Sequence, residues 1–143
     1  MMGSMLDTLR RIVKEVNTAP DLEKALATIV DLVKQAIACD VCSVYLTDAE
    51  QRAHVLAATN GLNADAVGKV ALPIGRGLVG LLAERAEPLN VGNALSHPRY
   101  LHVTETGETQ YRGFLGVPII QNRKVLGVLV VRQVAEREFS DDE

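Results

Sequence analysis

The spacing of apolar residues predicts two amphipathic helices in the first quarter of the chain. Residues 5–16 carry apolar side chains three or four positions apart, with charged side chains on the other side. Pro20-Asp21 interrupts this pattern and begins a second one, which ends near Cys39-Asp40. Its apolar stripe contains Leu22, Leu26, Ile29 and Val33. Each helix therefore has one face suited to a core.

Strict alternation of side chains then replaces the helical period. Residues 41–47 place Cys42, Val44 and Leu46 on one face of a strand, and Ser43, Tyr45 and Thr47 on the other. The same reasoning, with turn residues as boundaries, predicts strands at 53–59, 69–74, 88–91, 113–121 and 124–133, a short helix at 78–85 and a long polar loop at 92–109.

The order of these elements predicts an α+β domain with an antiparallel sheet, because adjacent strands are joined by short turns and strict βα alternation is missing. The last two strands are apolar at nearly every position, which is typical of strands buried on both faces. We expect them to lie centrally, with helices on one face of the sheet and the long loop over the other.

Composition excludes several classes of protein. A chain of 143 residues fits one domain, and 3% aromatic residues require an aliphatic core. The net charge of −3 lacks the basic block that nucleic acid would need, and no apolar run approaches the length of a membrane span. Two cysteines without a recognisable secretory signal favour a reducing, cytoplasmic location.

The C-terminal end of the chain suggests a piece of a longer protein, and the N-terminal end suggests a cloning scar. Residues 1–4 look like a cloning scar before a native start at Met5. Residues 140–143, Ser-Asp-Asp-Glu, form a capping box that announces a helix, and the chain stops there. We therefore expect a single domain over residues 5–143, truncated at its C-terminal helix.

Three motifs admit both a chemical and a structural interpretation. Residues 75–80 match G-x-G-x-x-G, but without a βαβ unit they favour a glycine turn over a nucleotide site. Cys39 and Cys42 form C-x-x-C in the order helix then strand, which favours buried structural thiols over a redox or zinc site. Arg112 borders an apolar strand, where it fits a carboxylate clamp in a cleft or a surface ion pair equally well.

Several stretches together resemble the GAF domain family over nearly all of residues 5–143. They are Asp40–Leu46, Gly75–Gly80, Glu87–Val91, Phe114–Ile119 and Val125–Leu129. More narrowly, residues 9–13, 41–46 and 112–120 look like the GAF domains of nitrogen-branch phosphoenolpyruvate–protein phosphotransferases. The resemblance implies a six-stranded antiparallel sheet, a helical layer on one face and a pocket on the other, roofed by residues 77–109.

The same resemblance implies a regulatory function without catalysis in this chain. In that family, the domain senses nitrogen metabolites, with glutamine or 2-oxoglutarate as first candidates, and tunes autophosphorylation of downstream domains. For such a sensor the pocket candidates are Ser43 and Tyr45 on the polar face of the first strand, Asn93 and His97 in the roof, and Arg112 as a carboxylate clamp. No metal or cofactor is expected. A homodimer through terminal helices is expected as well, and a dimerisation module without a ligand is the alternative. No Cys follows Cys42, unlike chromophore-binding or sulfoxide-reducing GAF branches.

Overall fold

A computed structural model describes residues 22–62, 64–99, 111–137 and 139. The predicted first helix, residues 1–4 and the capping box at 140–143 lie outside the described residues, as does much of the predicted long loop. No helix within the described ranges is long and apolar enough to cross a membrane.

The elements follow the order that the sequence predicts. The helices are α2 (Leu22–Ile37) and α3 (Gly77–Arg85), and two 3₁₀ turns, η1 (Ala64–Ala66) and η2 (Ala94–Ser96), were not predicted. The strands are β1 (Val41–Asp48), β2 (Ala53–Asn60), β3 (Ala71–Pro73), β4 (Leu89–Val91), β5 (Gly113–Gln121) and β6 (Lys124–Gln133).

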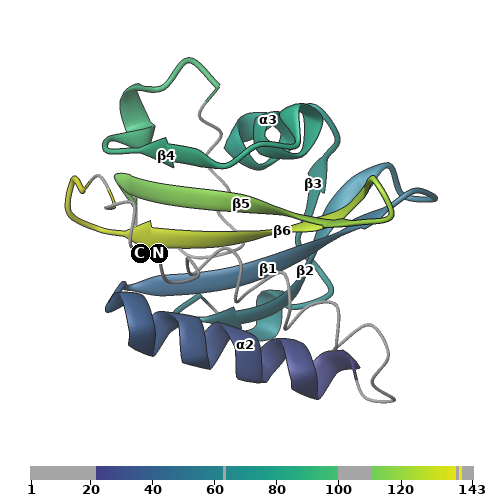
Figure 1. Cartoon of the computed structure of the whole chain (residues 1–143), viewed down its shortest axis with the longest axis horizontal. Helices are drawn as coiled ribbons and strands as arrows, with labels where there is room; N and C mark the ends of the chain where they lie inside the picture. The colour runs from purple at the N-terminus through teal and green to yellow at the C-terminus, as the bar shows by residue number, and fades with distance from the viewer. Residues whose placement is uncertain (1–21, 63, 100–110, 138, 140–143) are drawn as a thin grey trace.

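The strands form one six-stranded antiparallel sheet in the order β3-β2-β1-β6-β5-β4. Strands β5 and β6 lie inside the sheet, as their continuous apolar sequences predict, and the three-residue strands β3 and β4 form its edges. Figure 1 shows α2 along β1 and β2, and α3 beside β5 at the opposite end of the view.

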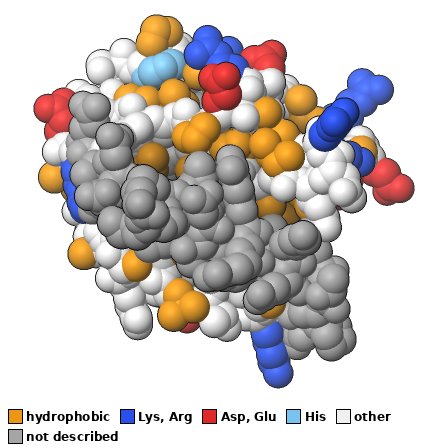
Figure 2. Space-filling view, in the orientation of Figure 1, with side chains coloured by type: hydrophobic (Ala, Val, Ile, Leu, Met, Phe, Trp, Pro, Cys, Tyr) orange, Lys and Arg blue, Asp and Glu red, His pale blue; other side chains and the backbone are white. Residues whose placement is uncertain are grey.

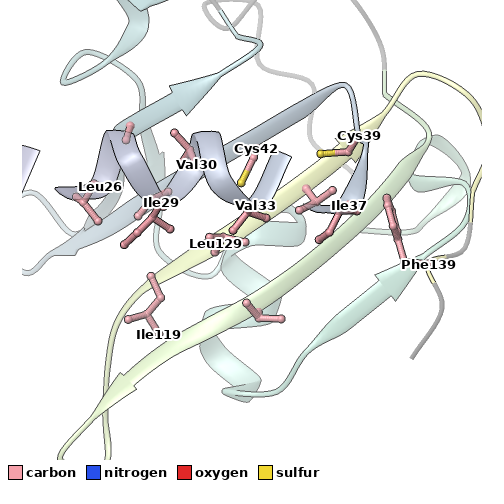
Figure 3. Close-up of a cluster of buried hydrophobic side chains, with 14 residues drawn as sticks. Leu26, Ile29, Val30, Val33, Ile37, Cys39, Cys42, Ile119, Leu129 and Phe139 are labelled. Atoms are coloured by element: carbon pink, nitrogen blue, oxygen red, sulfur yellow. The ribbon is translucent and has the colours of Figure 1, made fainter. Parts of the chain in front are cut away.

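One face of the sheet packs against α2. The stripe that contains Leu26, Ile29 and Val33 is buried against side chains of β1, β5 and β6, and both cysteines join this cluster (Figure 3). Burying each such aliphatic side chain contributes about 1.5–3 kcal/mol, so this interface is a main source of stability. Phe139, far along the chain, completes the same cluster.

The other face of the sheet packs against α3 and the turns, and this face is called the α3 face below. Tyr45, Leu56, Phe114 and Val130 lie here with two buried leucines and one buried valine of α3. The glycine turn before α3 supports this packing: Gly75 and Gly77 have positive φ, and a Cβ at Gly80 would press against the backbone of Gly75. These contacts account for the G-x-G-x-x-G pattern without a nucleotide.

Candidate functional site

Ser43 and Tyr45 lie on the α3 face, as the alternation in β1 predicts. The Ser43 side chain is fully buried, and its Oγ lies 2.9 Å from Oγ1 of Thr59 on the neighbouring strand. Tyr45 is only 1% exposed and packs in the α3-face cluster. Both residues therefore form part of the floor beneath α3, with the Ser43 hydroxyl already paired.

Asn93 and His97 flank η2, directly after the edge strand β4. Asn93 is half-buried, and its Oδ1 atom is buried without a hydrogen-bond partner among the described residues. His97 is also half-buried, but its Nδ1 accepts a hydrogen bond from the backbone N–H of Arg99 at 3.0 Å. Asn93 is thus the member of this pair with an unused acceptor.

Residues 93–97 are called the Asn93 wall below. Arg112 lies beside this wall, because its carbonyl oxygen accepts a hydrogen bond of 2.6 Å from the backbone N–H of Ala94. It precedes β5 by one residue, and strand alternation places it on the same side as Phe114. Its side chain is exposed. Arg112 therefore lies at the rim of the α3 face, and its exposure fits the surface position that the sequence left open beside a cleft.

Arg132 is a further basic residue at this end of the α3 face. It pairs with Phe114 across β5 and β6, and its guanidinium lies 5.9 Å from the centre of that ring. Its Nε is buried and has no hydrogen-bond partner within the described residues. A buried polar atom without a partner costs about 1–3 kcal/mol, so a bound water or ligand would be favourable here.

Arg112, Arg132 and Asn93 define what we call the arginine corner. Arg112 lies two residues before Phe114, the cross-strand partner of Arg132, so the two arginines lie near the same end of β5 and β6. No described carboxylate forms an ion pair with either arginine. The two guanidiniums suit a carboxylate, which Arg binds bidentately, whereas the unused oxygen of Asn93 suits an N–H donor.

His54 is also buried on the α3 face, but it lies far from the arginine corner. Its Nδ1 lies 3.0 Å from Oγ1 of Thr47, and its Nε2 has no partner among the described residues. Burial lowers the pKa of His54, which favours a neutral ring. Thr47 lies six residues along β1 from Val41, the partner of Arg132, a span of roughly 20 Å.

The cysteines do not form a reactive site. Cys39 and Cys42 are free and buried, and burial raises the pKa of both thiols. The described residues contain no cluster of three or more His, Cys, Asp or Glu side chains that could hold a metal ion.

Two hollows between described residues lie away from the arginine corner. An open groove of about 630 Å³ runs between the start of α2, the β1–β2 hairpin and the segment after η1, and its lining includes Leu26, Val55 and Val67. A second hollow of about 500 Å³ is lined by polar side chains of α2 and by Asn60. None of the five predicted site residues lines either of them.

Figure 2 shows one face of the molecule, where Lys and Arg side chains are scattered among Asp and Glu. Hydrophobic side chains gather on the upper part of this face, over the region of α3 and β5. The described side chains on this face therefore form no large patch of one charge.

Comparison with known proteins identifies the family. A model of the GAF domain matches residues 21–143. The chain belongs to the GAF family. Its six-stranded antiparallel sheet with α2 on one face and α3 on the other agrees with that assignment and confirms the predicted fold.

This GAF domain is similar to parts of larger phosphotransferase proteins. It is 44% identical over 139 residues to the "Phosphoenolpyruvate-dependent phosphotransferase system" protein of Salmonella typhimurium, covering 97% of this chain and 19% of that protein. The chain thus spans about a fifth of that relative.

Two solved structures resemble this GAF domain closely. The GAF domain from a phosphoenolpyruvate-protein phosphotransferase of Coxiella burnetii has 45% identity and a TM-score of 0.84, covering 97% of this chain and 83% of that one. The GAF domain from the Acinetobacter phosphoenolpyruvate-protein phosphotransferase has 45% identity and a TM-score of 0.81, covering 98% and 84%.

Of the five predicted site residues, Asn93 and Arg112 lie close along the backbone, since Ala94 donates a hydrogen bond to the carbonyl oxygen of Arg112. Tyr45 and Ser43 are buried on the α3 face, and His97 bonds within its own loop. Arg132 was missed by sequence reasoning. The alternation Val128, Val130, Arg132 in β6 could have revealed it, since it continues the buried face of that strand.

Proposed function

We propose that this GAF domain is a regulatory sensor of a small metabolite that carries a carboxylate. The observation that supports it is the arginine corner, where the buried Nε–H of Arg132 has no acceptor among the described residues, and a carboxylate would supply one. The buried Oδ1 of Asn93 is an acceptor without a donor there, so it would suit an N–H of the same ligand and not its carboxylate. A bound carboxylate would pair with Arg132 and draw the exposed Arg112 inward. The site then couples ligand binding to the position of β4 and η2.

Glutamine and 2-oxoglutarate are the first candidate ligands, since each has an α-carboxylate that a guanidinium can hold bidentately. Similarity to domains of phosphoenolpyruvate-dependent phosphotransferases supports a link to phosphoryl transfer in a longer protein. Its location in the cytoplasm is part of the proposal. In this proposal, the domain tunes autophosphorylation that takes place elsewhere in that protein. It does so through its different ligand affinity in two states.

A thermal-shift screen tests the proposal. The chain is heated with millimolar glutamine, 2-oxoglutarate, other amino acids and 2-oxo acids, and nucleotides. A ligand at 100 times its dissociation constant stabilises the fold by about 2.7 kcal/mol, which raises the melting temperature by several degrees.

Two variants separate specific binding from a general salt effect. Arg132→Gln removes the guanidinium of the arginine corner, whereas Arg123→Gln removes an exposed one from the β5–β6 turn. We expect the shift to vanish in Arg132→Gln and to persist in Arg123→Gln. A screen without any shift would contradict the sensor. It would favour the alternative, a GAF dimerisation module without a ligand, which light scattering would then detect as a dimer.

A further inference from the structure

The residues that follow β6 connect two parts of the fold that are distant in sequence. This post-β6 segment comprises residues 134–137 and Phe139. On one side it contacts the edge strand β4 and residue Gly92 beyond it, and on the other it contacts the C-terminal end of α2. It therefore lies between the wall that carries Asn93 and the main helix of the domain.

Asn90 holds the segment from the side of β4. Its Nδ2 donates a hydrogen bond of 2.7 Å to the carbonyl oxygen of Phe139, and its Oδ1 accepts one of 3.1 Å from the Phe139 N–H. The Arg137 N–H adds a bond of 3.1 Å to the carbonyl of Gly92. These three hydrogen bonds join β4 and Gly92 to the post-β6 segment.

Arg137 holds the segment from the side of α2. Its guanidinium donates to the carbonyl oxygens of Ile37 and Ala38 at the end of the helix, at 3.3 and 3.4 Å. The same group lies 4.4 Å from the centre of the Phe139 ring, which is buried in the α2 cluster. The last carbonyls of a helix have no partner within the helix, so such a cation is well placed there.

The two faces of strand β4 contact different parts of the molecule. Leu89 and Val91 pack in the α3-face cluster, whereas Asn90 points to the other face and holds Phe139. β4 has only three residues, and among the strands that the structure describes it pairs with β5 alone. Few backbone bonds therefore fix its position. A shift of this strand must move both the Asn93 wall and the post-β6 segment.

We propose that the post-β6 segment is a latch that couples the arginine corner to the C-terminal end of α2. A role of the latch in regulation rests on the proposed function, since a ligand bound at Asn93 and Arg132 would alter the contacts of the post-β6 segment. The coupling itself is a property of the chain without ligand.

Amide hydrogen exchange on the ligand-free chain tests the coupling. Asn90→Ala removes both hydrogen bonds to Phe139, and the reporters are the amides of Ala94 and Arg137, which bond to other partners. We expect both amides to exchange about tenfold faster, the effect of losing roughly two ordinary hydrogen bonds from a local opening unit.

Asn60→Ala is the matched control. Asn60 also makes two side-chain hydrogen bonds, to Asp31 and Lys34, but it lies on β2, away from β4. We expect this variant to leave the Ala94 and Arg137 amides unchanged. Should Asn90→Ala unfold the chain, Arg137→Gln opens the latch from the α2 side, and the Ala94 amide is read in the same way.

A faster rate at Ala94 in the latch variant and not in the control supports the proposal. Faster exchange confined to Phe139, or an equal response in Asn60→Ala, overturns it. Because no ligand is present, failure of every metabolite to bind would refute the sensor and leave this result intact. A coupled latch in a chain that binds nothing would point to signal transmission alone.

Discussion

Replacing Phe139 by Ala should destabilise the domain far more than a residue four positions from the end of the chain would suggest. The side chain is 3% exposed and joins the α2 cluster with Ile37 and Cys39. Phe→Ala in a core costs about 3–5 kcal/mol. Since solvent can partly fill a space near the surface, we expect the lower end, about 3 kcal/mol, which includes about 0.5–1 kcal/mol from the Arg137 contact.

Urea denaturation followed by circular dichroism at 222 nm measures this effect, because the chain has no Trp for fluorescence. A loss of about 3 kcal/mol corresponds to roughly 10 °C in melting temperature for a domain of this size. Val134→Ala is the control, since Val134 is 43% exposed, and it should change stability by less than about 0.5 kcal/mol. A loss below about 1 kcal/mol for Phe139→Ala would refute a structural role for this segment.

Three further predictions concern the sheet. Burial lowers the pKa of His54 below its ordinary value of about 6.5, so just below that pH the unfolded chain binds more protons than the folded one. The stability that depends on a neutral His54 is complete above pH 6.5 and is lost as the pH falls below that value. In urea denaturation, the midpoint of His54→Gln should therefore fall less on acidification than that of the unchanged chain. Cys39 and Cys42 should react with a thiol reagent only in urea, and rapid labelling of the native chain would contradict their burial. Gly127→Ala should cost about 1–3 kcal/mol in the same denaturation assay, since its Cβ would overlap the carbonyl oxygen of Tyr45, and an unchanged midpoint would show that β1 and β6 can separate.

Local pattern was sufficient to predict the regular elements. The period of α2 and the alternation of β1 depend on which face is buried, and the structure buries the faces that the sequence indicates. The two 3₁₀ turns were missed because each is three residues long and has no period. The shift of register in β2 opposite Val44 and Tyr45 also leaves no mark in a single sequence.

Long-range contacts limited the prediction of the site. Asn90 and Phe139 are 49 residues apart, so no local pattern joins them. Arg112 was assigned by its position before an apolar strand, whereas its exposure depends on how β4 and η2 pack beside it. Arg132 was visible as the next inward position of β6, and only the fold shows that it faces Phe114.

The most direct test of the account is to map ligand binding by NMR on the uniformly ¹⁵N-labelled chain titrated with 2-oxoglutarate and, separately, with glutamine. The account predicts that at least one of them shifts amide signals around Asn93, Arg112 and Arg132, with saturation, and that Arg132→Gln abolishes the shifts. Saturating shifts confined to the groove beside Leu26 and Val67, or no shifts with either metabolite, would contradict a carboxylate site at the arginine corner.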